Sequence, residues 1–351
     1  MGIQRKALIE RVIGAGTGFA CAGAVTLTMA KYWKLRSNRL RGKVVLITGA
    51  SRGLGLAMAE EFGRRGAKLA LAARDAKELG RARALLLQRG AAKDTQDIFV
   101  FPSDLRKPED AEKLIQETTK HFAHIDILIN NAGIITAGPI ENQAIEDFKN
   151  VMETNFFSGV YCTLSVLPQM LARKEGGIVN IASIGGKIAV PHMLPYTASK
   201  FAVVGFSEGL NAELRAKGIR VTTVCPGLMR TGSHLNAMFK GDAEREYRWF
   251  SLGASLPGIS ISARSAARKV VRAVIAGKGE IAITPQAEFA TRVGNLSPET
   301  TMRIMQLMNL ILPAAVNEPT SARRGSEVRR LELTSAMALG NAASRYYNQV
   351  Q

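Results

Sequence analysis

Residues 44–55 have the sequence VVLITGASRGLG, and this stretch decides the fold. An apolar run, VVLIT, is followed at once by a glycine-rich loop and by a pattern that predicts a helix near 53–65. Glycines let a backbone turn tightly and approach a phosphate, and the N-terminus of the next helix attracts the anion. The stretch therefore predicts a strand, a phosphate-binding loop and a helix, in that order.

The same alternation continues along the chain. Further apolar runs lie at 69–73, 98–101, 126–130, 177–182, 220–224 and 280–284. Helical patterns lie near 75–89, 108–122, 143–173, 196–216 and 263–276. Seven strands separated by helices predict an α/β fold: a Rossmann-type doubly wound parallel sheet with helices on both faces. Such sheets bind ligands at the carboxyl ends of their strands.

The charge of the chain is concentrated at its two ends. The 351 residues include 47 Lys and Arg and 29 Asp and Glu, and 46% are hydrophobic. This composition excludes a disordered chain, a collagen and a polytopic membrane bundle. Residues 44–263 hold 26 basic and 22 acidic residues, so most of the net charge of +18 lies outside them. A nearly neutral core without a basic face argues against nucleic acid as a partner.

Residues 12–30 form an uncharged run, VIGAGTGFACAGAVTLTMA. As a helix it would span roughly 28 Å, close to the ~30 Å hydrocarbon core of a bilayer. The heavier basic flank follows it, which places the downstream chain in the cytoplasm. We expect a single N-terminal membrane anchor; the alternatives are an amphipathic leader, a signal peptide and a soluble cytoplasmic protein.

Two arginines bear on the choice of cofactor. The second strand ends at Ala73 without the acid that binds the adenosine ribose of NAD, and Arg74 follows. Arg52 lies in the glycine-rich loop. Both could face a 2′-phosphate, so we expect NADP(H) to be favoured over NAD(H); the alternative is two solvated arginines.

Tyr196 and Lys200 share one face of a predicted helix, and Ser183 lies just beyond the fifth strand. A free tyrosine is a poor acid at neutral pH, but a neighbouring ammonium stabilises its phenolate and lowers its pKa. These three residues are therefore candidates for proton transfer in one cleft. The three cysteines are far apart in sequence, and we expect no metal site.

Together these motifs resemble the short-chain dehydrogenase/reductase family over roughly residues 41–285. The resemblance rests on TGASRGLG (48–55), Asp104, NNAG (130–133), Asn155, Ser183, YTASK (196–200), Pro226-Gly227 and Thr231. It implies that the catalytic residues are Asn155, Ser183, Tyr196 and Lys200. It also implies a cofactor site formed by Gly49, Ser51, Arg52, Gly53, Leu54, Gly55, Arg74, Asp104, Leu105, Asn131, Ala132, Gly133, Tyr196, Lys200, Pro226, Gly227 and Thr231.

The resemblance also implies a role for each catalytic residue. Ser183 would bind the substrate carbonyl, Tyr196 would transfer the proton, and Lys200 would bind the nicotinamide ribose and lower the tyrosine pKa. Asn155 would support a water relay. The expected activity is hydride transfer between NADPH and a carbonyl or alcohol substrate: a moderately large apolar ketone, an aldehyde, or a 3-oxoacyl or lipid-like compound. The alternative is a cofactor-binding regulatory or interaction protein without turnover.

The chain is longer than the family pattern at both ends. Residues 1–40 hold the hydrophobic segment, and residues 286–351 form an extension that we expect to be partly helical and poorly ordered near its end. In the family the surface near the last strand often builds a tetramer. Because the extension would cover that surface, a dimer is favoured over a tetramer.

Overall fold

The computed structural model describes residues 40–349, apart from 256–259, 318–320 and 329–337. The predicted anchor at residues 12–30 lies outside the described residues. Within the described ranges, no helix has both the length and the apolar character needed to cross a membrane.

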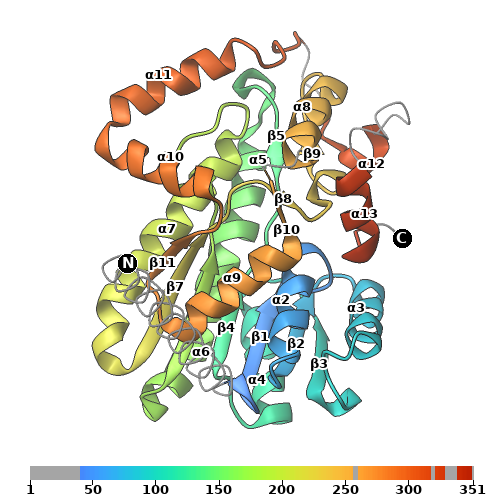
Figure 1. Cartoon of the computed structure of the whole chain (residues 1–351), viewed down its shortest axis with the longest axis vertical. Coiled ribbons are helices and arrows are strands. Elements are labelled where there is room, and N and C mark those ends of the chain that lie inside the picture. Colours follow the sequence, from blue (N-terminus) through green and yellow to red (C-terminus); the bar gives the residue numbers. More distant parts are fainter. Residues whose placement is uncertain (1–39, 256–259, 318–320, 329–337, 350–351) are drawn as a thin grey trace, which may run out of the picture.

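Seven parallel strands form the central sheet, in the order β11-β7-β6-β4-β1-β2-β3 (Figure 1). Their bounds are β1 Val44–Thr48, β2 Lys68–Ala73, β3 Ile98–Pro102, β4 Ile127–Asn130, β6 Gly176–Ile181, β7 Ile219–Cys225 and β11 Glu280–Ala282. Each lies at a predicted apolar run. The predicted doubly wound α/β fold is therefore confirmed.

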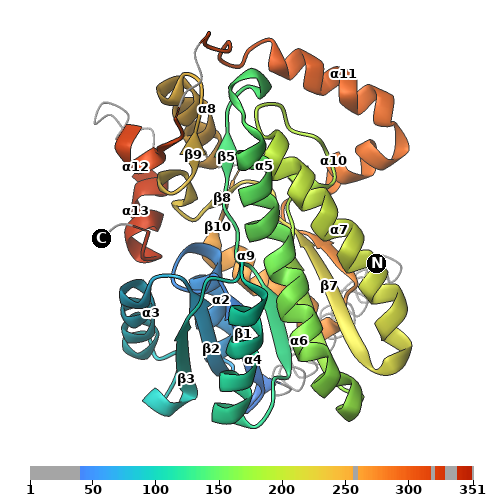
Figure 2. The ribbon, with the colours of Figure 1, turned by 180° about the vertical axis from the view of Figure 1, so that it is seen from behind.

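Helices cover both faces of this sheet (Figures 1 and 2). One face carries α2 (Gly53–Gly63), α3 (Ala76–Gln88) and α9 (Ala263–Ala276); the other carries α4 (Pro108–Phe122), α6 (Ser158–Arg173) and α7 (Leu194–Leu214). Alternate residues of β1 pack into the hydrophobic cores on the two faces of the sheet. Val45 and Ile47 pack with α2 and α9, whereas Leu46 packs with α4 and α6. A strand buried on both faces has a continuous apolar sequence for this reason.

The strand order reverses between β1 and β4. After β3 the chain crosses back over β1 and β2 to place β4 on the other side of β1. The loops that leave β1 and β4 therefore diverge at the carboxyl edge of the sheet, which is where such folds bind ligands.

The predicted helical region 143–173 is interrupted. It consists of α5 (Ile145–Met152), a π-helical turn (Glu153–Phe157) and α6. Single π-turns inside helices are rare and frequent at functional sites. The turn contains Asn155, one of the predicted site residues.

Above the sheet lies a second layer of short elements. Helix α8 (Ala243–Ser255) packs beside β5 (Thr136–Ala137), β8 (Met229–Arg230) and β9 (Met238–Phe239). Strand β10 (Ile261–Ser262) pairs with β8. The C-terminal extension is mainly helical, as predicted, with α10 (Pro285–Leu296), α11 (Pro298–Asn309), α12 (Gly325–Val328), α13 (Ala338–Tyr346) and the short β12 (Arg323–Arg324). Near the end of the chain, where we predict poor order, α13 leads into residues 347–349, and Tyr347 is buried against the core.

Candidate functional site

A cavity of about 720 Å³ opens at the carboxyl edge of the sheet. Its volume lies within the ~300–1,000 Å³ usual for ligand sites. The loops that follow β1, β2, β3, β4, β6 and β7 all contribute to its lining. The predicted site residues, with the exception of Asn155, therefore lie around one cavity.

The glycine-rich loop leaves no room for side chains at its base. A Cβ on Gly55 would lie 2.2 Å from the carbonyl oxygen of Gly49, and a Cβ on Gly49 would lie 2.8 Å from Ala132 Cα. Gly49 and Gly53 also have positive φ values of 62° and 58°, a conformation that glycine adopts without strain. The loop is therefore held close to the end of β4, with its backbone facing the cavity.

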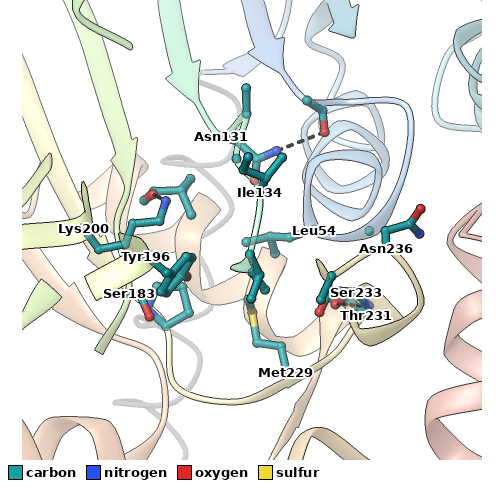
Figure 3. Close-up of a pocket in the computed structure, with 18 of the residues that line it drawn as sticks. Leu54, Asn131, Ile134, Ser183, Tyr196, Lys200, Met229, Thr231, Ser233 and Asn236 are labelled. Atoms are coloured by element: carbon teal, nitrogen blue, oxygen red, sulfur yellow. Dashed lines mark hydrogen bonds between the residues drawn. The ribbon is translucent and has the colours of Figure 1, made fainter. Parts of the chain in front are cut away.

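Asn131 ties this loop to the end of β4. Its Nδ2 donates to the carbonyl oxygens of Thr48 (2.9 Å) and Gly49 (3.0 Å), and Figure 3 draws one hydrogen bond from this side chain. The backbone N–H groups of Asn131 and Ala132 both donate to Thr48 Oγ1. This network fixes the separation between the two loops at the switch point, and Gly133 continues the wall of the cavity.

Ser183, Tyr196 and Lys200 lie together on one side of the cavity (Figure 3). Ser183 follows β6 and caps a short turn by accepting a hydrogen bond from Gly185 N (3.1 Å). Tyr196 and Lys200 lie one turn apart on α7, and Lys200 Nζ lies 5.6 Å from the centre of the tyrosine ring. The structure brings the three predicted proton-transfer residues together.

The titration of Tyr196 differs from our expectation. Burial raises the pKa of its hydroxyl and outweighs the hydrogen bond with Ser183, which favours the phenolate. Burial also lowers the pKa of Lys200 to about 8. The ammonium of Lys200 donates to the carbonyl oxygen of Ile181 (2.9 Å) rather than to the phenol. In this structure burial therefore has the largest effect on the pKa of Tyr196, and the predicted influence of Lys200 on that pKa stays a prediction.

Asn155 lies behind the cavity wall. It is 5% exposed, and its Oδ1 accepts from Ile134 N (2.7 Å) while its Nδ2 donates to Ile134 O (3.1 Å) and Ser199 Oγ (3.0 Å). These bonds connect the π-turn, the loop after β4 and α7, the helix that carries Tyr196 and Lys200. Asn155 thus holds the wall in place from outside the cavity.

The opposite end of the cavity is rich in charge. Arg52 Nη1 donates to Glu78 Oε1 (2.8 Å), and Ser51 Oγ donates to Glu78 Oε2 (2.9 Å). Arg74 is exposed and lines the cavity. Asp75 caps α3 by accepting from Glu78 N. Of the two predicted arginines, Arg74 is exposed on the cavity, and Arg52 is paired with Glu78, an acid that the sequence does not predict as its partner.

Asp104 and Leu105 line the same end, after β3. The carboxylate of Asp104 accepts from Arg106 Nε (2.9 Å) and Nη2 (2.6 Å), and this pairing lowers its pKa. Leu105 is buried. This part of the cavity is therefore lined by the apolar side chain of Leu105 and by the carboxylate of Asp104, which is paired with Arg106.

The loop after β7 closes the third side of the cavity. Pro226, Gly227 and Thr231 all line it. A Cβ on Gly227 would lie 2.5 Å from Thr284 Oγ1, so this close approach requires glycine. The carbonyl oxygen of Pro226 accepts from Ile184 N (2.8 Å), which joins this loop to the Ser183 loop.

Beyond Tyr196 the cavity is apolar. Its lining there includes Ile188, Val190, Met193, Leu228, Met229, Trp249, Phe250, Met305 and Met308. Trp249 is held by Glu246, a fully buried acid that accepts from Trp249 Nε1 (2.6 Å) and pairs with His192 Nδ1 (2.7 Å). Leu194, which follows Met193 in sequence, is 38% exposed and is not among the residues that line the cavity.

Several lining residues were not anticipated. Asn236, Met305, Met308, Arg324 and Gln349 come from the segment after β7 or from the C-terminal extension. They carry no motif and lie far from the glycine-rich loop in sequence. The sequence offers one signal for them, a basic cluster of four arginines at positions 323, 324, 329 and 330. Taken alone, such a cluster predicts a solvated tail or a contact with anionic lipid.

Comparison with known proteins agrees with this site. The family model described as short chain dehydrogenase matches residues 43–238. A "Dehydrogenase/reductase SDR family protein 7-like" of Anopheles gambiae is 37% identical over 281 residues, covering 80% of this chain and 87% of that protein. An "11-beta-hydroxysteroid dehydrogenase A" of Arachis hypogaea is 31% identical over 328 residues, covering 89% and 90%.

Solved structures agree as well. A short chain dehydrogenase/reductase from Burkholderia phymatum, crystallised in complex with NAD, superposes with a TM-score of 0.66 at 26% identity. The match covers 74% of this chain and 95% of that one. The sheet, the cavity and these similarities lead to one conclusion: the chain belongs to the short-chain dehydrogenase/reductase family.

Proposed function

We propose that this chain is an NADP(H)-dependent reductase that acts on the carbonyl group of a moderately large apolar substrate. The observation that carries the proposal is the position of Ser183, Tyr196 and Lys200. They lie on one wall of a single cavity, between a charged end and an apolar end. A dinucleotide would occupy the charged end and a ketone or aldehyde the apolar end, with the reacting carbonyl beside Tyr196.

The chain's own residues suit a dinucleotide. The absence of space for a Cβ at Gly49 and Gly55 supports close approach of the loop backbone to a pyrophosphate. The residues that would hold the cofactor are Gly49, Ser51, Arg52, Gly53, Leu54, Gly55, Arg74, Asp104, Leu105, Asn131, Ala132, Gly133, Tyr196, Lys200, Pro226, Gly227 and Thr231. When bound, the cofactor supplies the hydride that the carbonyl carbon accepts.

Tyr196 supplies the proton. Its hydroxyl keeps its proton at neutral pH because burial raises its pKa, so it can donate that proton to the carbonyl oxygen as the oxygen becomes negative. Ser183 donates a hydrogen bond to the same oxygen. Lys200 places a positive charge beside the phenol and favours the phenolate left behind. Asn155 is hydrogen-bonded to both the loop after β4 and α7. It thereby fixes the position of α7, which carries Tyr196 and Lys200.

The preference for NADP(H) rests on Arg74. It is exposed on the cavity at the point where an NAD-binding protein would carry an acid. The nearest acid, Asp75, is engaged as the N-cap of α3. The similar structure from Burkholderia phymatum is described in complex with NAD. The ratio of the affinities of this chain for NADPH and NADH therefore tests the proposed preference directly, and a higher affinity for NADH would contradict it.

The apolar end supports a large substrate. Aromatic and aliphatic side chains line it, and a relative similar over nine-tenths of its length is named a hydroxysteroid dehydrogenase. Steroid ketones are therefore the first compounds to assay, followed by long-chain aldehydes and 3-oxoacyl thioesters. The assay follows NADPH oxidation by the full chain in detergent. Turnover with apolar ketones supports the proposal. Absence of turnover across the panel, with NADPH still bound, would favour a regulatory protein.

Membrane attachment through residues 12–30 and a dimeric state stay predictions. Membrane fractionation of the chain with and without residues 1–34 tests the anchor. We expect the full chain in the membrane fraction and more of the shortened chain in the soluble fraction. An equal soluble fraction for both would contradict it. Light scattering of the detergent-solubilised chain distinguishes a dimer from a tetramer.

A further inference from the structure

The end of the chain lies against the glycine-rich loop. In both views α13 stands next to α8, directly above α3 and the start of α2 (Figures 1 and 2). Residues 347–349 continue from α13 onto the loop. Tyr347 and Asn348 are buried. This segment, residues 344–349, is called the C-terminal strap below.

The strap binds the loop through the backbone. The carbonyl oxygen of Tyr347 accepts from Gly53 N (2.9 Å). Asn348 Nδ2 donates to the carbonyl oxygens of Ser51 (2.8 Å) and Glu78 (3.2 Å). Asn348 Oδ1 in turn accepts from Arg81 Nε (3.2 Å). One side chain of the strap therefore bridges the loop and α3, the two elements that carry the charged end of the cavity.

The strap also reaches the opposite wall. Gln349 Oε1 accepts from Asn236 Nδ2 (2.7 Å), and Ser344 packs so closely on Gly232 that a Cβ there would lie 2.2 Å from Ser344 Oγ. Gln349 also lines the cavity, and a Cβ on Gly53 would lie 2.7 Å from its Nε2. The strap thus joins the two walls of the cavity, and its Gln349 lines the cavity.

The contacts around the strap are specific. Arg89 stacks on the Tyr346 ring, with 3.7 Å between its Cζ and the ring centre, and donates to the Tyr346 carbonyl oxygen (2.6 Å). Burial raises the pKa of Tyr347 to about 12. A buried aromatic side chain, a cation–π contact and several hydrogen bonds indicate a docked segment rather than a solvated tail.

A second part of the extension adds charge to the cavity. Strand β12 pairs with β9, and of its two exposed arginines only Arg324 lines the cavity. The pKa of Arg52 is lowered chiefly by burial and further by the charges of Arg324 and Arg74. Arg324 therefore lines the same cavity as Arg52, Arg74 and Arg106. Of these four arginines, Arg52 is paired with Glu78 and Arg106 with Asp104. Like charges gathered at one cavity favour a polyanionic ligand.

We propose that the C-terminal extension completes the cofactor site: Arg324 binds a phosphate group of the dinucleotide, and the C-terminal strap holds the glycine-rich loop in its binding conformation. The inference rests on the proposed function, because it assumes a dinucleotide in the cavity. It assigns a role to residues that lie outside residues 43–238, the part that the family model matches.

The first test compares Arg324→Ala with Arg323→Ala in the full chain, by measuring the dissociation constants of NADPH, NADH and 2′,5′-ADP. Arg323 is the matched control, since it is the neighbouring exposed arginine and does not line the cavity. We expect Arg324→Ala to weaken NADPH binding about tenfold, as for loss of one charge-assisted hydrogen bond, and Arg323→Ala to leave it within about twofold.

The probes separate the two kinds of phosphate. A loss for NADPH and 2′,5′-ADP but not NADH places Arg324 at the 2′-phosphate; an equal loss for NADPH and NADH places it at the pyrophosphate. Both results support the proposal. Equal binding by Arg324→Ala and Arg323→Ala would overturn the assignment of Arg324.

The second test addresses the strap. Asn348→Ala removes the bridge between the loop and α3, whereas Arg345→Ala changes an exposed residue of α13 that does not line the cavity. We expect Asn348→Ala to raise the NADPH dissociation rate about tenfold and Arg345→Ala to leave it unchanged. Equal dissociation rates in the two variants would overturn the role of the strap.

The two proposals can fail separately. If the wild-type chain binds neither NADPH nor NADH, the proposed function fails. If it binds them and all four variants bind alike, the dinucleotide site of the proposed function stands and the C-terminal extension has no part in that site. Thermal unfolding of each variant without ligand confirms that a change in binding does not come from loss of the fold.

Discussion

The replacement of Gly55 by alanine is the sharpest test of the phosphate-binding loop. The added Cβ would lie 2.2 Å from Gly49 O, 2.7 Å from Asn131 Nδ2 and 3.0 Å from Ala50 Cα. Ordinary van der Waals contact begins at 3.4 Å, so the Gly49 carbonyl would have to retreat by about 1.2 Å. It cannot do so freely, because Asn131 Nδ2 donates to it at 3.0 Å.

Such overpacking costs about 1–3 kcal/mol. We therefore expect Gly55→Ala to lower the free energy of unfolding by that amount in denaturant titration. We also expect a loss of NADPH affinity of at least about tenfold by calorimetry, because the loop must move away from the position that faces the cavity.

Gly80→Ala is the matched control. Gly80 lies inside α3, and no heavy atom lies within 4 Å of the Cβ it would gain. Alanine is about 1 kcal/mol better than glycine in a helix, so this variant should be as stable as the wild type or more stable, with unchanged affinity. If Gly55→Ala bound NADPH as well as Gly80→Ala, the loop would not be the phosphate site.

Three further variants probe the charged and apolar ends. Glu78→Gln should free Arg52 and remove a negative charge beside the cavity, so the ratio of NADPH to NADH affinity should rise about fivefold in parallel titrations; an unchanged ratio would contradict a phosphate-facing Arg52. Burial lowers the pKa of Lys200 to about 8 from an ordinary value of 10.5. Between these two pH values Lys200 is protonated in the unfolded chain and largely deprotonated in the folded chain. The contribution of Lys200 to the free energy of unfolding therefore rises with pH over this range. Lys200→Met should lack this gain in denaturant unfolding at pH values on either side of 8, whereas parallel pH curves for the two proteins would argue against a buried ammonium. Glu246→Ala leaves the Trp249 N–H unpaired, so we expect a loss of about 1–3 kcal/mol of stability and a KM for bulky ketones that rises more than kcat falls; a selective loss of kcat would place Glu246 in the chemistry instead.

The sheet and most of the cavity could be predicted because their signals are local. The apolar runs of β1 and β2 are continuous since both faces of these strands are buried. The glycine-rich loop follows its strand directly, and Tyr196 and Lys200 lie one helical turn apart. In each case spacing along the chain translates directly into proximity.

Contacts between distant segments could not be predicted in this way. The sequence predicts that Arg52 of the glycine-rich loop faces a 2′-phosphate, but Arg52 is paired with Glu78, which lies on α3. Arg324 and Gln349 reach the cavity through a two-residue strand and a short helix, neither of which has a periodicity that identifies a partner. The pKa of Tyr196 also depends on burial, which the spacing of Tyr196 and Lys200 does not determine.

The role of Tyr196 is tested most directly by Tyr196→Phe, which removes only the hydroxyl. Two quantities should be measured on the same preparation: the NADPH dissociation constant and the rate of NADPH oxidation with an apolar ketone that the wild type reduces. We predict an affinity within about twofold of the wild type and a rate lower by at least about a hundredfold, as for loss of a general acid. An unchanged rate in this variant would contradict the account of proton transfer by Tyr196.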